Sequence, residues 1–339
     1  MLIYCVWAVL ALVGGAALWL LGYGIYSAVQ EYRPDRVPAL LYHQLISKGK
    51  VDRGELVCHE RVYVEYDVNF AEQMGYLHDE GYTTITLDEL LACRDEGKPL
   101  PQRPIVLTFD DGFMSTYIHA FPILKQYGMT ATIFGNPDRD CQNFRKYAHI
   151  DSPLIPEQIR EMSAYGIAIE SHGMTHRFLT ELPRDVVRWE LQESKKVLEE
   201  LTKKSVRYLA VPSGAINRSV RLLAQESGYE AIFTGLKGTN NPASNRYALR
   251  RLVVARDCSL AKFEKLLRPT TAIHLRLTSV LQDMLLSALG PAGFDNLRDS
   301  LCRSRLGSLL IGGQTRFVIG GLAVAIILVV LLGSFIVSH

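Results

Sequence analysis

Two pairs of metal-ligating side chains stand at short spacing in this sequence. Asp110 and Asp111 are adjacent in IVLTFDDG, and His172 and His176 lie four residues apart in ESHGMTH. Adjacent carboxylates repel each other, and burying either of them costs free energy unless a positive charge is close. If the histidine segment turns helically, its two imidazoles share a side and, with a carboxylate from Asp110 or Asp111, can bind one divalent metal. Such a set leaves coordination positions open for water and substrate.

The elements that must position these residues alternate along the middle of the chain. Apolar runs of strand length cover residues 37–43, 83–87, 105–109, 131–134, 167–171, 207–211, 231–235 and 251–255. Amphipathic stretches predict helices over 67–80, 115–127, 156–165, 184–203 and 217–227. Repeated strand-then-helix units imply a parallel sheet with both faces covered, either a closed barrel or a doubly wound sheet. In both folds the chemistry collects at the C-terminal ends of the strands, where both aspartates and His172 fall.

The segment 184–203 shows the clearest helical pattern. One stripe consists of Val187, Leu191, Ser194, Leu198 and Leu201. Glu190 falls among the charged residues on the rest of the helix, so we expect it to face solvent.

Composition excludes several classes of function. The 339 residues carry a formal net charge of +2, with a pI of about 8.1, so no nucleic-acid-binding surface is expected. The six cysteines occur singly and without CxxC pairs, which argues against a zinc ribbon or a dense disulfide framework and fits a reducing compartment.

Both ends of the chain contain long runs without a charged side chain. Residues 2–29 and 317–338 each exceed the ~20 residues that a helix needs to cross a bilayer. We therefore expect transmembrane helices over 1–30 and 317–338, and a location in the cell (inner) membrane. Basic residues on the inner flanks of both runs favour the cytoplasmic side for the segment between them.

Three motifs, in this order, resemble those of the polysaccharide deacetylases with a NodB-like domain, carbohydrate esterase family 4. They are LLYH at 40–43, TFDDG at 108–112 and SHGMTH at 171–176. The branch that deacetylates poly-N-acetylglucosamine, with a YH near its start, is the most similar. The resemblance covers roughly residues 36–256 and implies an α/β fold, a distorted (β/α) barrel. We expect a deacetylase domain over 31–256 and a helical, partly amphipathic extension over 257–316.

The resemblance also implies roles for the residues of the opening motifs. It implies a metal-dependent hydrolysis of an amide, with zinc as the first choice and cobalt or nickel as alternatives. Asp110 would be the general base toward water, and Asp111 would bind the metal together with His172 and His176. The cation would neutralise the carboxylate of Asp111 and so offset the repulsion between the two aspartates.

The segment AVPSG at 210–214 aligns with a third motif of this family. Pro212 and Gly214 match the motif, whereas Ala210 replaces an arginine and Ser213 replaces a tyrosine. We expect Pro212, Ser213 and Gly214, together with Tyr42, to contact the substrate. Tyr42 could instead simply fill the mouth of the barrel.

The residue that protonates the leaving group is not assigned by the motifs. No segment matches the late histidine of the family, and His274 lies beyond the predicted sheet, where a surface position is expected. His43 could donate this proton, or it could only pack beside the site.

Three functions are consistent with these observations. The first is deacetylation of an N-acetylated amino-sugar polysaccharide on the extracytoplasmic side, in contact with polysaccharide synthesis or export proteins. The second is deacylation of a lipid-linked or nucleotide-linked amino sugar at the inner face of the membrane. The third is a non-catalytic saccharide-binding or scaffold component of a polysaccharide-export system, which the replacements at Ala210 and Ser213 would allow.

Overall fold

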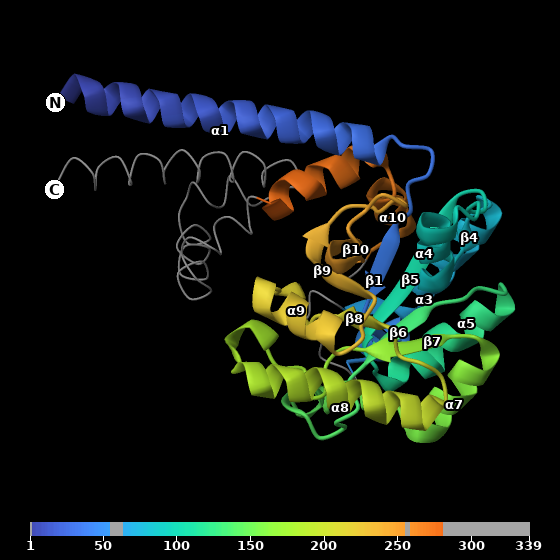
Figure 1. Cartoon of the computed structure of the whole chain (residues 1–339). Helices are drawn as coiled ribbons and strands as arrows, with labels where there is room; N and C mark the ends of the chain where they lie inside the picture. Colours follow the sequence, from blue (N-terminus) through green and yellow to red (C-terminus); the bar gives the residue numbers. More distant parts are fainter. Residues whose placement is uncertain (1, 55–63, 255–257, 281–339) are drawn as a thin grey trace. The chain divides into compact units, whose positions relative to one another are not determined.

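The computed structural model describes residues 2–54, 64–254 and 258–280, and its contacts divide the chain into two compact units (Figure 1). One unit is Arg33–Arg268, and the other combines Met1–Tyr32 with Pro269–His339. The domain boundaries expected from the sequence stay a prediction.

The unit Arg33–Arg268 contains a closed barrel of seven parallel strands. Their order is β1 (Ala39–Tyr42), β10 (Leu249–Val253), β9 (Ala231–Lys237), β8 (Tyr208–Ala210), β7 (Ala168–Ser171), β6 (Thr132–Gly135) and β5 (Pro104–Asp111). Pairing of β1 with β5 closes the ring, and the short β4 (Thr83–Thr84) pairs with the start of β5. The predicted covered, parallel sheet is therefore confirmed in its barrel form. A separate parallel pair, β2 (Gln44–Ile46) and β3 (Val64–Tyr66), was not predicted.

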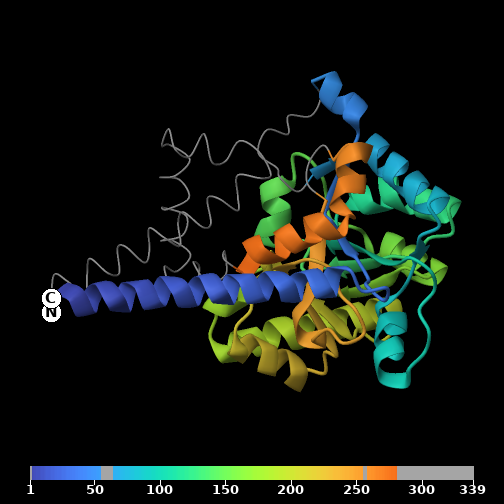
Figure 2. The same cartoon turned by 90° about the horizontal axis from the view of Figure 1, so that it is seen from above.

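Helices lie around the outside of the barrel (Figures 1 and 2). They are α2 (Lys48–Asp52), α3 (Asp67–Asp79), α4 (Leu87–Glu96), α5 (Phe121–Gln126), α6 (Gln142–Tyr147), α7 (Pro156–Tyr165), α8 (Arg184–Thr202), α9 (Arg218–Glu226) and α10 (Leu260–Leu266). The single helix predicted over 115–127 is instead a π-helical turn, Thr116–Ala120, followed by α5. Pro122 stands in the first turn of α5, and because proline has no backbone N–H to donate, it disfavours a continuous helix there.

The interior of the barrel is apolar mainly where the strands begin. Strand residues of this cluster, among them Val106 and Leu249, pack with Leu87, Leu90 and Leu91 of α4. α4 begins with a capping box, in which Thr86 and Glu89 each accept a hydrogen bond from the other's backbone N–H. α4 therefore closes this end of the barrel with leucine side chains.

α8 confirms the predicted stripe but not the predicted exposure of its polar side. Val187, Leu191, Ser194 and Leu198 are buried, as expected. Glu190 is also fully buried, although its place in the pattern predicted a solvent-facing side chain. A buried carboxylate requires polar partners, and those of Glu190 lie beside the candidate site.

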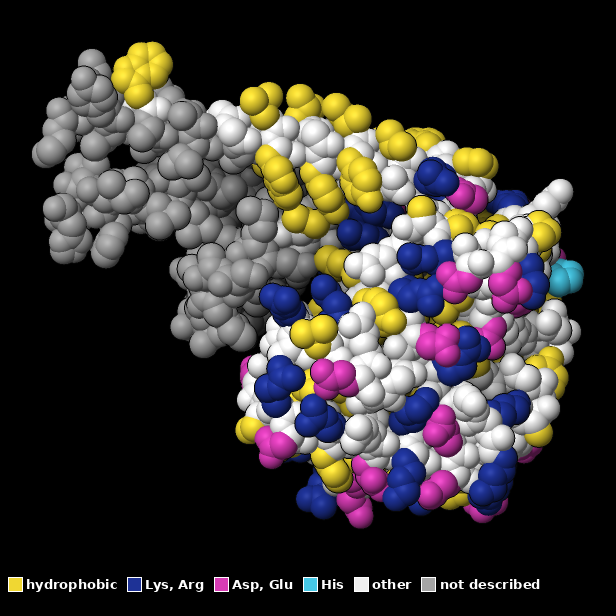
Figure 3. Space-filling model, viewed as in Figure 1, with side chains coloured by type: hydrophobic (Ala, Val, Ile, Leu, Met, Phe, Trp, Pro, Cys, Tyr) yellow, Lys and Arg dark blue, Asp and Glu magenta, His cyan; other side chains and the backbone are white. Residues whose placement is uncertain are grey.

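Charged side chains of both signs are interspersed on the face of this unit seen in Figure 3. Several of them form ion pairs, such as Arg188 of α8 with Glu226 of α9 at 3.1 Å. The charge on this face therefore indicates no single class of ligand.

The second unit contains α1 (Leu2–Glu31) and a helical segment over 269–280. Among the described residues, no helix is both long and apolar enough to span a membrane. The prediction of a transmembrane helix over 1–30 is therefore wrong, and so is the inner-membrane location that rested on two such spans; residues 317–338 lie outside the described part. In α1 the side chains of Ser27 and Glu31 are buried, and Glu31 forms an ion pair with Arg276 of the segment 269–280. Large apolar side chains elsewhere on α1 are exposed, among them Leu18, Leu21, Ile25 and Val29.

Candidate active site

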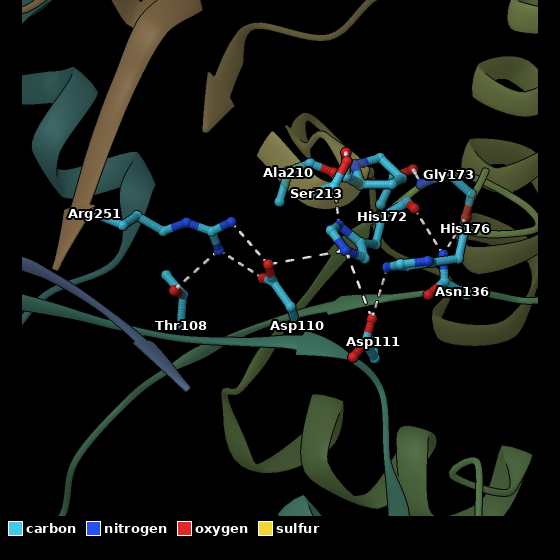
Figure 4. A network of polar contacts seen from close by, with 12 residues as sticks. Thr108, Asp110, Asp111, Asn136, His172, Gly173, His176, Ala210, Ser213 and Arg251 are labelled. Carbon is cyan, nitrogen blue, oxygen red and sulfur yellow. Dashed lines mark hydrogen bonds and ion pairs between the residues drawn. The ribbon is translucent and has the colours of Figure 1, made fainter. Parts of the chain in front are cut away.

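The two adjacent aspartates end β5 and have different surroundings. Successive side chains of the fully buried strand β5 point alternately into the barrel and outward. Asp110 shares the inward side with Val106 and Thr108, so its carboxylate points into the barrel. Asp111 is the last residue of β5 and has a φ of +74°, a conformation that is costly for a residue with a Cβ. The two carboxylates differ in their nearest partners, Arg251 for Asp110 and His176 for Asp111, and both lie near His172 (Figure 4).

Asp110 forms a buried two-pronged ion pair with Arg251 of β10. Arg251 Nη1 and Nη2 donate to the two carboxylate oxygens at 2.6 and 2.8 Å. Burial alone would raise the pKa of Asp110, but the charge and hydrogen bonds of Arg251 outweigh it and lower the pKa. The guanidinium also lies over the rings of Phe233 and Phe134, with its carbon 5.2 and 5.8 Å from their centroids. Arg251 was not among the predicted site residues, although the run LRRLVV, read with strand alternation, places it inward with Leu249.

Asp111, His172 and His176 converge at the mouth of the barrel. Asp111 Oδ1 lies 3.2 Å from His176 Nε2 and 3.7 Å from His172 Nε2, and one ligand atom from each of the three residues falls within 4.8 Å of the others. Burial opposes ionisation of Asp111, yet its interaction with His176 lowers the pKa of this carboxyl. Burial likewise disfavours a charged His176, but the closeness of Asp111 raises the pKa of the imidazole.

The state of His172 suits it to bind a cation. Its Nδ1 lies 2.7 Å from the carbonyl oxygen of Ala210, and because a carbonyl only accepts, Nδ1 must carry the proton. Nε2 is then left with a free electron pair that points toward Asp111. Burial lowers the pKa of His172 to about 4, so the ring is neutral at pH 7.

The donor set formed by these three residues fits a divalent metal. The buried Asp111 Oδ1 has no hydrogen bond of regular geometry from the described residues, although His176 Nε2 is close. Two imidazole nitrogens and one carboxylate are ligands that zinc, cobalt and nickel accept. The three residues therefore could hold such an ion and leave positions open for water and substrate.

The turn after β8 lies beside His172 in Figure 4. Pro212 is buried, whereas Ser213 is exposed and has a φ of +56°. Gly214 follows with a φ of +76°, and a Cβ at this position would overlap the backbone of Gly235. The sequence AVPSG thus forms a tight turn that leaves Ser213 at the mouth of the barrel.

The two residues of the YH motif lie in different places. His43 follows β1, and the charges of Asp111, Asp110, Arg251 and His176 all influence it, while burial lowers its pKa. The Tyr42 side chain packs on Phe70 and Phe109, and its hydroxyl donates to Gln73 Oε1 of α3 at 2.7 Å. The structure therefore brings His43 to the site, while the described contacts of Tyr42 are with α3 and β5.

Comparison with known proteins identifies the family. The family model for polysaccharide deacetylases matches residues 97–232. The Bacillus subtilis protein YxkH, which is named for the same family, is 30% identical over 237 residues, covering 69% of this chain and 77% of YxkH. The chain belongs to the polysaccharide deacetylase family. Its homologues are deacetylases, hydrolases of amide bonds, and this chain is an enzyme of that class.

More distant relatives agree with this assignment. A poly-β-1,6-N-acetyl-D-glucosamine N-deacetylase of Staphylococcus epidermidis is 27% identical over 253 residues, covering 70% of this chain and 84% of the relative. The Streptococcus pyogenes deacetylase PplD has a TM-score of 0.59 at 22% identity, covering 69% of this chain and 99% of PplD. IcaB from Ammonifex degensii has a TM-score of 0.57 at 23% identity, covering 70% and 98% of the two chains. These two structures support the barrel fold.

Proposed function

We propose that this deacetylase removes N-acetyl groups from an amino-sugar polysaccharide of the exopolysaccharide or cell-wall type. The observation that carries the proposal is the convergence of Asp111, His172 and His176 at a barrel mouth that also holds Asp110. The Staphylococcus epidermidis relative, named for poly-β-1,6-N-acetyl-D-glucosamine, supports this class of substrate. We place the deacetylase domain at 31–256 and a helical extension at 257–316.

Asp111, His172 and His176 would hold one divalent ion, with zinc as the first choice and cobalt or nickel as alternatives. Bound there, the ion would polarise the amide carbonyl and lower the pKa of a water molecule. His172 is prepared for this role because Ala210 fixes the proton on Nδ1.

Asp110 would act as the general base that takes a proton from the attacking water. Its oxygen Oδ2 lies 3.9 Å from His172 Nε2, beside the proposed metal, and both of its oxygens are bound by Arg251. The two bonds from Arg251 keep Asp110 ionised in a buried position and fix the direction of its carboxylate. The third motif of the family has an arginine where this chain has Ala210. Arg251 thus supplies a positive charge that position 210 does not.

Two further groups would complete the chemistry. The backbone N–H of Ser213, a residue exposed at the mouth, could donate to the oxyanion that forms when water adds to the amide. His43 could protonate the leaving amine, but its lowered pKa means that the ring must first take up a proton.

The function can be tested on the full chain by measuring acetate release. We expect release from β-1,6-linked N-acetylglucosamine oligomers, loss of release when zinc is removed by a chelator, and recovery when zinc is restored. Release only from nucleotide-linked or lipid-linked N-acetylglucosamine would favour the second substrate class. Bound zinc with no release from any of these compounds would favour a saccharide-binding protein instead.

A further inference from the structure

The loop that carries His176 has an unusual backbone. Residues 173–177 follow β7, and both Gly173, with a φ of +76°, and His176, with a φ of +60°, have left-handed conformations. For a residue with a Cβ, such a conformation costs about 1–3 kcal/mol and persists only when its surroundings impose it. The position of His176 must therefore be determined by contacts that hold this loop.

The carboxylate of Glu190 provides most of those contacts. Its Oε2 accepts hydrogen bonds from the backbone N–H groups of Met174 at 2.8 Å and Thr175 at 2.9 Å. Its Oε1 accepts from Arg177 Nε and Nη2 at 3.0 and 2.9 Å, and from the Thr175 hydroxyl. Glu190 therefore contacts the residues on both sides of His176 in the chain.

The other side of the loop is held through its carbonyl groups. Asn136 Nδ2, at the end of β6, donates to the carbonyl oxygens of His172 and Gly173 at 2.7 and 3.1 Å. The backbone N–H of Asp138 donates to the carbonyl of Met174 at 3.2 Å. The loop is thus fixed between donors from the segment after β6 and an acceptor from α8.

We propose that Glu190 is a positioning residue for the metal ligand His176, an inference that rests on the proposed metal site. Glu190 projects from α8, a helix of 19 residues, and Val187 and Leu191 on the same helix are buried. The helix is therefore a rigid support for the Glu190 carboxylate. Fixing the N–H of Thr175 fixes the residue that immediately precedes His176. Partners that orient a ligand in this way commonly change metal affinity about 10–100-fold when they are replaced.

A purely structural role for Glu190 makes a different prediction. If its carboxylate only satisfied the loop's N–H groups, its replacement would lower the stability of the fold and leave the affinity of the folded protein for metal unchanged. Metal affinity and the geometry around the metal therefore distinguish the two roles, whereas loss of activity does not.

The test uses Glu190→Gln in the full chain, with Glu199→Gln as the matched control. Glu199 lies on the same helix, and its Oε1 accepts from the N–H of Val206 at 2.9 Å, away from the loop. Zinc affinity is measured by competition with a chelator, and ligand geometry by the visible absorption of the cobalt-loaded protein. We expect Glu190→Gln to bind zinc about 10–100-fold more weakly and to alter the cobalt spectrum. Glu199→Gln should stay within about twofold of the wild type.

Arg177→Ala keeps the test decisive if Glu190→Gln does not fold. Arg177 is about half exposed, and its loss removes two of the bonds to Glu190 without emptying a buried position. We expect zinc affinity about three- to tenfold weaker than that of the wild type. If Glu190→Gln binds zinc as tightly as the wild type, the inference is wrong and the proposed function stands. The same holds for Arg177→Ala if Glu190→Gln is unfolded. A wild type that binds neither zinc nor cobalt overturns the proposed function, and the inference with it.

Discussion

The two ends of the barrel differ in what their inward side chains contact, although the same strands supply both. Where the strands begin, Val106 of β5 and Leu249 of β10 pack against the leucines of α4. Two steps of alternation further along β5 and one step further along β10, Asp110 faces Arg251 through two short hydrogen bonds. Because both sets face inward, the distance along the strand decides whether a side chain serves packing or polar chemistry. Each end should therefore respond to substitution in its own way.

The largest effect on turnover is expected from Asp110→Asn. Asparagine keeps the size of the side chain and an acceptor for Arg251, but it cannot take a proton from water. We expect kcat/KM for acetate release to fall about 10²–10⁴-fold. Retention of more than a tenth of wild-type activity would exclude Asp110 as the general base.

Leu90→Ala is expected to have the largest effect at the apolar end. Leu90 is 2% exposed, and truncation of a buried leucine lowers the free energy of unfolding by about 2–5 kcal/mol. Chemical denaturation measures this loss, and kcat/KM well below the melting temperature should stay within about twofold. The exposed Leu222 of α9 is the control, since Leu222→Ala should cost less than about 0.5 kcal/mol. A loss of activity equal to that of Asp110→Asn would show that the two ends are not separate.

Arg251→Met should shift the pH dependence of catalysis. Arg251 now outweighs the burial of Asp110 and lowers its pKa, so without this charge the pKa rises. The acid limb of kcat/KM should therefore move to higher pH, with activity about 10–100-fold lower near pH 6 and less affected at high pH. Arg250→Met is the neighbouring control, because Arg250 donates to the Lys237 carbonyl instead. An unchanged acid limb would contradict the role assigned to Arg251.

Glu170→Gln should give the smallest change, which is confined to stability. Burial raises the pKa of Glu170 to about 8, although the N–H groups of Tyr208 and Arg207 oppose the shift. The unfolded chain then loses this proton first, so the carboxyl lowers stability progressively as pH rises from about 4.5 to 8. Relative to the wild type, Glu170→Gln should gain stability progressively across this range, measured by urea unfolding of the metal-free chain. Parallel stability curves would show that Glu170 does not titrate in this range.

Much of the barrel could be predicted because its elements have local patterns. The apolar runs of β5, β6 and β7 and the stripe of α8 each reflect burial of neighbouring residues in the chain. α4 was missed although Thr86 and Glu89 have the spacing of a capping box, which marks the start of a helix. The charge-free run of residues 2–29 was overinterpreted, because it forms the helix α1, but the absence of charge alone does not establish a membrane span.

The candidate site could be predicted only where its residues lie in motifs. Asp110, Asp111, His172 and His176 stand in two short stretches, and the structure brings them together. Arg251 reaches Asp110 from 141 residues away, a pairing that depends on β1 lying between β5 and β10. Glu190 was expected in solvent because helical periodicity describes one face of α8 and not the loop that packs against it.

The central claim is that the two adjacent aspartates have different roles, and metal content tests it most directly. Zinc bound by the purified Asp110→Asn and Asp111→Asn variants should be measured beside the wild type, after equal exposure to the ion. We predict that Asp110→Asn keeps the wild-type amount of zinc and that Asp111→Asn loses it. Loss of zinc in Asp110→Asn together with its retention in Asp111→Asn would contradict the assignment.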